Sequence, residues 1–64
     1  MADWSGCNFS GAPLSHVDLH DANLVGINLS GADLEKAYLL GSHLEHSNLN
    51  YADMPNADLS FANL

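Results

Sequence analysis

Large apolar residues recur at every fifth position along the whole chain. The series starts at Trp4 and ends at Leu64 without a break. These thirteen positions, called the centres below, are Trp4, Phe9, Leu14, Leu19, Leu24, Leu29, Leu34, Leu39, Leu44, Leu49, Met54, Leu59 and Leu64. Because spacing this regular is typical of repeat architectures, the period has to be explained before any secondary structure is assigned.

The residues around each centre obey the same rule. Two positions before a centre the residue is always small or β-branched. Directly before it stands Asp or Asn in ten of thirteen repeats, the exceptions being Pro13, Tyr38 and His43. All five glycines lie two residues after a centre, where they supply the positive φ that many tight turns need. Each repeat therefore predicts one short side followed by one corner.

A period of five excludes both common elements. On a helix each repeat advances about 140° around the axis, so the leucines would spread over every side. In a flat strand, side chains alternate between faces, so successive leucines would point in opposite directions. The pattern is consistent only if the chain bends by a fixed angle in each repeat, so that every centre points towards one axis.

The sequence resembles the pentapeptide-repeat family, whose Ala-(Asp/Asn)-Leu-x-x consensus is matched at Ala22–Leu24, Ala32–Leu34, Ala52–Met54, Ala57–Leu59 and Ala62–Leu64. The resemblance implies an all-β fold, a right-handed quadrilateral parallel β-helix with four repeats in each coil. We expect one uncapped domain over residues 1–64, with about three coils. Coil one is then residues 2–21, coil two is 22–41 and coil three is 42–61, with 62–64 beginning a fourth.

This register makes two further predictions. The inward centres stack in four columns, and at a strand spacing of ~4.8 Å the coils form a prism ~15 Å tall. Pro13 and Pro55 fall in the first and third coils, where one side of the ladder is free.

Composition narrows the class of protein. The 64 residues carry a net charge of −7, with Lys36 as the only Lys or Arg. This charge argues against direct binding to nucleic acid or anionic lipid, so we expect a basic or neutral protein partner. No apolar run reaches 18 residues and no signal peptide is recognisable, which predicts a soluble, cytoplasmic protein.

The candidate catalytic groups give no convincing site. The register places every His, Asp, Glu and Lys outward, where no low-dielectric core tunes a pKa for catalysis. We therefore expect no enzyme, no catalytic residues and no cofactor. The disfavoured alternative is a surface-metal enzyme at His43, Glu45 and His46, but alternation puts only the first two on one face.

Two smaller features leave alternatives open. His16 and His20 lie near Asp18 and Asp21, and we interpret all four as exposed side chains rather than metal ligands. Cys7 takes an inward position under Ile27. It is interpreted as a small buried hydrophobe, with a reactive thiol as the alternative.

The acidic surface suggests a second function. Some pentapeptide-repeat proteins protect or inhibit DNA gyrase, and their negative prism has been interpreted as a DNA mimic. A duplex carries one charge per ~1.7 Å, so a ~15 Å prism would replace only a few base pairs. Five of the acids, Asp3, Asp18, Asp33, Asp53 and Asp58, also occupy the position where the family normally has Asp or Asn. Gyrase inhibition or protection therefore remains the alternative to a structural scaffold or protein–protein interaction element.

Contacts with a protein are predicted at two places. Tyr38, Leu40 and Phe61 form an outward apolar group on one side of the coil. The uncapped ends would expose apolar centres, so we expect either a fragment of a longer protein or end-to-end stacking on a second copy. The residues proposed for stacking are Trp4, Phe9, Leu49, Met54, Leu59 and Leu64.

Overall fold

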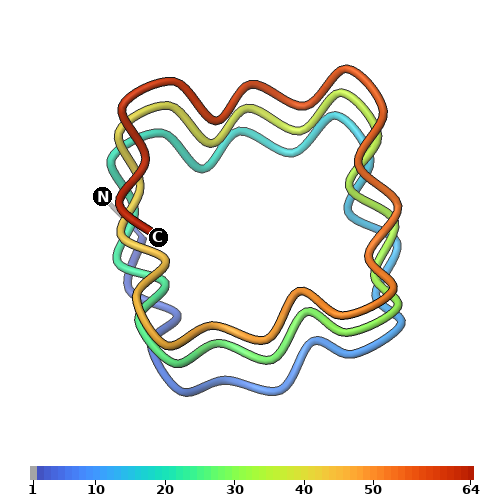
Figure 1. Ribbon diagram of the computed structural model, residues 1–64, viewed down its shortest axis with the longest axis horizontal. Helices are drawn as coiled ribbons and strands as arrows, with labels where there is room; N and C mark the ends of the chain where they lie inside the picture. Colours follow the sequence, from blue (N-terminus) through green and yellow to red (C-terminus); the bar gives the residue numbers. More distant parts are fainter. Residues whose placement is uncertain (1) are drawn as a thin grey trace.

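The computed structural model describes residues 2–64; Met1, which the predicted domain includes, lies outside the described residues. Over this range the chain has no helix and no continuous strand, and its β-structure consists of single bridge residues at position 3 and every fifth residue after it. All bridges are parallel and join residues twenty apart, such as Asp3 with Asn23 and Asn23 with His43. The chain thus winds as an all-β coil of four repeats per turn, with the four sides seen in Figure 1.

Backbone hydrogen bonds hold each repeat to the repeat one coil above it. In the first repeat, Trp4 N donates to Asn23 O at 2.9 Å and Gly6 N donates to Val25 O at 2.9 Å. Asn23 N donates back to Ala2 O at 2.9 Å. The same three bonds recur around the coil, so a bridging residue such as Asn23 bonds to the two residues that flank its partner, as in a parallel ladder.

The corners are tight turns closed by a hydrogen bond over three residues. Cys7 N donates to Trp4 O at 3.1 Å, and an equivalent bond closes every corner up to the one between Leu59 and Ala62. The residue two after each centre has a positive φ, between 56° and 70°, at all twelve corners. This is the conformation of a type II turn, so the prediction that glycine marks these corners is confirmed. Seven corners carry another residue instead: His16, Asp21, Lys36, His46, Tyr51, Asn56 and Phe61.

The Asp or Asn before the centre stabilises the side that leads into the corner. Its Oδ1 accepts a hydrogen bond from the backbone N–H two residues later, as Asn28 does from Ser30 at 3.1 Å. Within residues 2–64 eight such bonds form, at Asp3, Asn8, Asp18, Asn23, Asn28, Asp33, Asn48 and Asp58.

The two prolines fit the coil for different reasons. The bridging N–H points to the coil below, so Pro13 in the first coil lacks a donor that the coil does not use, as predicted. Pro55 occupies a position whose N–H bonds only to the Asp or Asn side chain two residues before it, and it is therefore compatible with any coil. The explanation that Pro55 needs the free ladder side of the third coil is wrong.

The core lies in the second coil and at its boundary with the third. Leu24, Leu29, Leu34 and Leu39 are fully buried, together with the small or β-branched residues two positions before them. The Cα trace measures 22 × 21 × 17 Å, which gives a nearly square cross-section and a height close to that predicted. Leu19 in the first coil and Leu44 in the third are also buried. The other centres of these two coils pack against the core but remain partly exposed, since each has a neighbouring coil on one side only.

Candidate interaction surfaces

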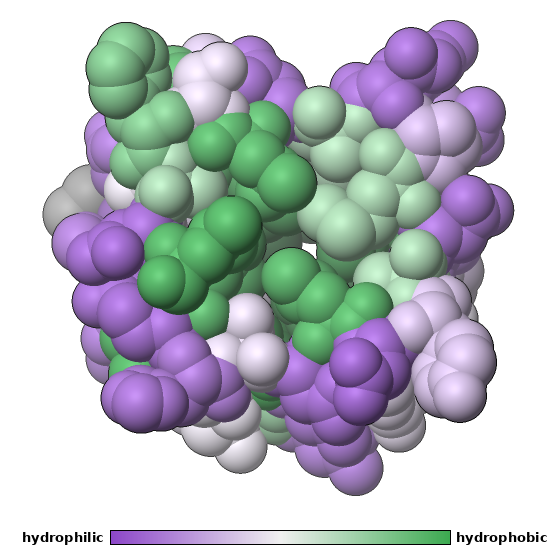
Figure 2. Space-filling view, viewed as in Figure 1, coloured by the Kyte–Doolittle hydropathy of each residue, from purple (hydrophilic) through white to green (hydrophobic). Residues whose placement is uncertain are grey.

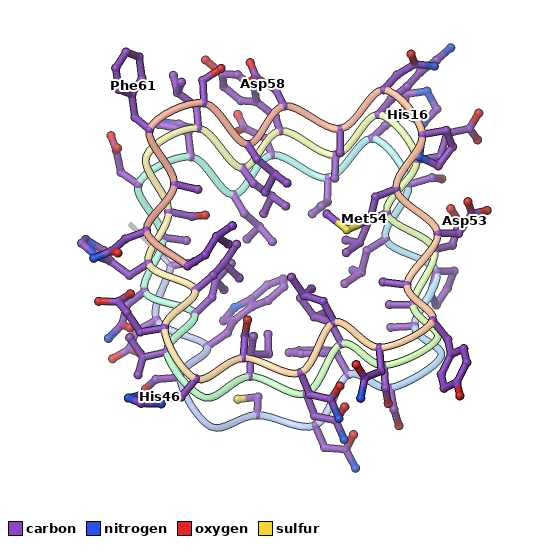
Figure 3. All side chains as sticks on the ribbon, in the orientation of Figure 1. His16, His46, Asp53, Met54, Asp58 and Phe61 are labelled. Atoms are coloured by element: carbon purple, nitrogen blue, oxygen red, sulfur yellow. The ribbon has the colours of Figure 1, made fainter. Side chains whose placement is uncertain are left out.

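The four sides of the coil differ sharply in charge. Side one comprises residues 2–6, 22–26, 42–46 and 62–64, side two 7–11, 27–31 and 47–51, side three 12–16, 32–36 and 52–56, and side four 17–21, 37–41 and 57–61. Sides three and four carry three carboxylates each, side one carries two and side two none. Figure 3 shows Asp53 and Asp58 pointing outward from adjacent sides, while Met54 points into the coil.

The predicted apolar contact group lies on side four. Tyr38 is 38% exposed and replaces the usual Asp or Asn, between Asp18 in the coil below and Asp58 in the coil above. Leu40 is half-buried beside it, whereas Phe61 is 91% exposed at the corner of the third coil. The structure thus places all three on one side, with Phe61 presenting most of the exposed apolar surface.

A polar and aromatic cluster links the first two coils of side four. His20 Nδ1 and Asp18 Oδ1 are 2.7 Å apart, and the His20 ring lies 5.9 Å from the Tyr38 ring, centre to centre. The hydrogen bond to Asp18 and the charges of Asp18 and Asp21 raise the pKa of His20, while the same bond lowers the pKa of Asp18. His20 and Asp18 remain exposed, as predicted, but their pairing was not anticipated.

The proposed metal residues do not converge. His43 Nδ1 lies 3.8 Å from Glu45 Oε1 on side one, so the prediction that these two share a face is confirmed. Glu45 Oε2 accepts a hydrogen bond from Asn63 Nδ2 at 3.2 Å. His46 lies at the following corner, where Figure 3 labels it. Within residues 2–64, no three His, Cys, Asp or Glu side chains gather in a way that could hold a metal ion.

A shallow depression marks the lower part of side one and the corner before it. It is lined by Ala2, Asp3, Asp21, Asn23, Val25 and His43. It contains no nucleophile beside a base and no oriented third group, which are the parts that hydrolytic chemistry requires.

Cys7 is exposed, which makes the predicted burial wrong. Its inward position under Ile27 is as expected, because Asn28 N donates to Cys7 O in the ladder. The first coil has no coil beneath it in the structure, so an inward position there is open to solvent. A buried hydroxyl occurs instead at Ser42, which is fully buried and whose Oγ has no hydrogen-bond partner within the described chain.

The two ends of the coil are closed to different extents. At the N-terminal end the rings of Trp4 and Phe9 lie 4.7 Å apart at 35°, and both are partly buried. At the other end Leu49, Met54 and Leu59 are partly buried, but Leu64 is 73% exposed. Figure 2 shows this end as an apolar centre with a largely hydrophilic rim, which apolar atoms interrupt at the upper left. The residues proposed for stacking therefore do line the two ends.

Sequence reasoning missed the two ring contacts. His20 and Tyr38 could have been paired from the register, because Asp18 and Tyr38 are twenty residues apart and His20 follows Asp18 by two. Trp4 and Phe9 are consecutive centres, but only the structure shows that their rings meet at the open end.

The part of the chain that the structure describes contains no helix long and apolar enough to cross a membrane.

Comparison with known proteins identifies the repeat. A search of curated proteins found no match. The model of the family described as pentapeptide repeats matches residues 2–31 and 27–64, with eight copies of its unit. Because these matches span nearly the whole sequence, the chain belongs to the pentapeptide repeat family.

Proposed function

We propose that the chain is a non-enzymatic structural scaffold or protein–protein interaction element, built on the right-handed quadrilateral β-helix expected of its family. Family membership suggests a structural or interaction module. The observation that carries the proposal is the division of the chain between a buried apolar core and an outer surface that bears every charged residue. No acid, base or thiol is enclosed in a pocket of the described residues where its reactivity could be tuned.

The C-terminal end is the first contact surface that we propose. It presents Leu49, Met54, Leu59 and Leu64 together with unpaired ladder groups, and such an end accepts further coils of the same kind. For the 64-residue chain in solution, a second copy can supply this cover. Symmetric contact of like ends is the commonest form of homodimer, and burying on the order of a few hundred Å² of apolar surface would stabilise it by several kcal/mol.

Sedimentation velocity at increasing concentration tests this proposal. We expect a dimer at micromolar concentration and a monomer for Leu64→Lys, which places a charge on the exposed apolar end. Trp4→Lys is the matched change at the N-terminal end. The reactivity of the Cys7 thiol reports independently whether that end is covered in the dimer. Association through the C-terminal end leaves Cys7 reactive towards a thiol reagent in the dimer. A wild-type monomer at high micromolar concentration would contradict end-to-end association.

Gyrase inhibition by DNA mimicry is less well supported by the distribution of charge. A duplex carries phosphates along both strands over its whole surface. In this chain the acids concentrate on the adjacent sides three and four, and side two carries none. A supercoiling assay with purified gyrase separates the two functions, since a scaffold leaves the reaction unchanged.

A further inference from the structure

Side four departs from the repeat pattern in all three kinds of outward position. Tyr38 replaces Asp or Asn before a centre, Leu40 stands where serine is the commonest residue, and Phe61 occupies a corner where glycine is favoured. Two of them give up a feature that stabilises the coil elsewhere: the Asp or Asn hydrogen bond is absent at Tyr38, and Phe61 adopts a φ of 59° that costs an L-residue energy. A side chain that is unfavourable for the coil and exposed to solvent is a candidate for binding.

Carboxylates surround this apolar group. Asp18 lies directly below Tyr38 and Asp58 directly above it in the ladder. The Asp21 carboxylate lies against Gly41, so closely that a Cβ at that glycine would collide with Oδ1, and Phe61 follows at the same corner one coil higher. The surface therefore combines exposed aromatic and aliphatic carbon with three negative charges.

The same side already holds a nitrogen base in this environment. The His20 ring lies 5.9 Å from the Tyr38 ring, centre to centre, and its Nδ1 lies 2.7 Å from Asp18 Oδ1. An arginine or lysine side chain placed over the other edge of Tyr38 would meet Asp58 in a comparable way, because guanidinium and ammonium groups bind both aromatic faces and carboxylates.

We propose that side four binds a basic segment of another protein, in which arginine or lysine stands next to an apolar residue. The inference rests on the proposed function, since it names the kind of partner for an interaction element. The charges select against other occupants. A second copy brings only Lys36 as a fixed positive charge, and nucleic acid would be repelled by the net charge of −7.

The test uses a short synthetic peptide of alternating arginine and leucine, titrated into the isotopically labelled 64-residue chain and followed by NMR. We expect the amide signals of Tyr38, Leu40 and Phe61 to shift, with weaker binding at higher salt. A peptide with glutamate for arginine, and one with glycine for leucine, should each bind at least about tenfold more weakly, because each lacks one half of the recognition.

The variants use residues that the repeat already carries at the same positions. The triple change Tyr38→Asn, Leu40→Ser and Phe61→Gly should weaken peptide binding at least about tenfold and leave the circular dichroism spectrum unchanged. Tyr51→Gly is the control at another corner of the third coil: Tyr51 is 95% exposed and ends side two, which has no carboxylate, although side three with Asp53 begins directly after it.

Charge is tested separately, without changing the aromatic group. Asp58→Asn retains the acceptor for the Ser60 N–H and should weaken binding several-fold, whereas Asp53→Asn on side three makes the same charge change and should have less effect.

Three results would overturn the inference: absence of binding, equal losses for the triple variant and Tyr51→Gly, or equal losses for Asp58→Asn and Asp53→Asn. A chain that forms dimers through its end but ignores the peptide refutes this inference alone, while the proposed scaffold function stands.

Discussion

The substitution Leu34→Ala tests the inward register at its most enclosed point. Leu34 is fully buried in the second coil, with Leu14 below it and Met54 above it in the same column. The change removes three carbon atoms, which at ~0.8 kcal/mol per methylene amounts to about 2.4 kcal/mol of transfer free energy. A cavity between two packed coils adds to this, so the free energy of unfolding should fall by about 2–5 kcal/mol.

This loss is large relative to the whole fold. A 64-residue chain at ~0.05–0.15 kcal/mol per residue has a free energy of unfolding of about 3–10 kcal/mol. In a domain of this size 1 kcal/mol changes Tm by about 4–8 °C, so Leu34→Ala should lower Tm by roughly 10 °C or more.

Urea unfolding provides the assay, with two probes read in parallel. Circular dichroism reports the whole coil, and the fluorescence of Trp4, the only tryptophan, reports the N-terminal end beside Phe9. Coincident transitions would show that the coils unfold together. Earlier loss of the Trp4 signal would show that the first coil opens separately, as the ends of repeat proteins can.

The neighbouring residue supplies the controls. Asp33 is exposed, and its Oδ1 accepts a hydrogen bond from Glu35 N at 3.1 Å. Asp33→Asn keeps that bond and should change stability little, while Asp33→Ala loses it and should cost about 0.5–1.5 kcal/mol. If Leu34→Ala and Asp33→Ala were equally destabilising, the assignment of inward and outward positions would be wrong. A helical circular dichroism spectrum would contradict the fold itself.

Three further perturbations test the polar groups. Ser42→Ala removes a buried hydroxyl without a partner, so urea unfolding should show unchanged stability or a gain of up to about 1–2 kcal/mol, and a marked loss would reveal an unseen hydrogen bond. The raised pKa of His20 gives stability that is lost as pH rises through it, and the lowered pKa of Asp18 gives stability that is lost as pH falls through it, so the pair contributes fully between pH 3.8 and 6.5. An NMR titration should show the pKa of the His20 ring returning towards 6.5 in Asp18→Asn, and an unchanged pKa would exclude the hydrogen bond as its cause. Stoichiometric zinc should raise Tm little, and a large rise abolished by changing His43 and His46 together would restore the metal site.

The fold could be predicted because its information is repeated thirteen times. Each repeat carries one inward centre, one small inward residue and one corner, so a local exception such as Ser42 does not change the register. The positive φ at every corner was predictable from the five glycines, although seven corners adopt it without glycine. At those positions the hydrogen bonds of the neighbouring coils determine the backbone and override the preference of the residue.

Surface details were harder to predict because they depend on what lies above and below. Cys7 occupies the inward position expected of it, yet it is exposed because the structure has no coil beneath it. The contact between His20 and Tyr38 needs both the twenty-residue register and a particular orientation of each ring. A five-residue pattern contains neither piece of information.

The separation of inward and outward positions also indicates where function can be encoded. Inward residues are constrained by the columns they fill, so they differ little from one repeat to the next. Outward residues that keep the Asp or Asn hydrogen bond and the glycine corner serve the coil. Departures from that pattern are the positions where a side chain can serve another purpose, and Tyr38, Leu40 and Phe61 are three apolar departures on one side. Apolar departures also occur singly, at Val25 on side one and Tyr51 on side two, but three of them share side four with three carboxylates, which is the reason to examine side four first.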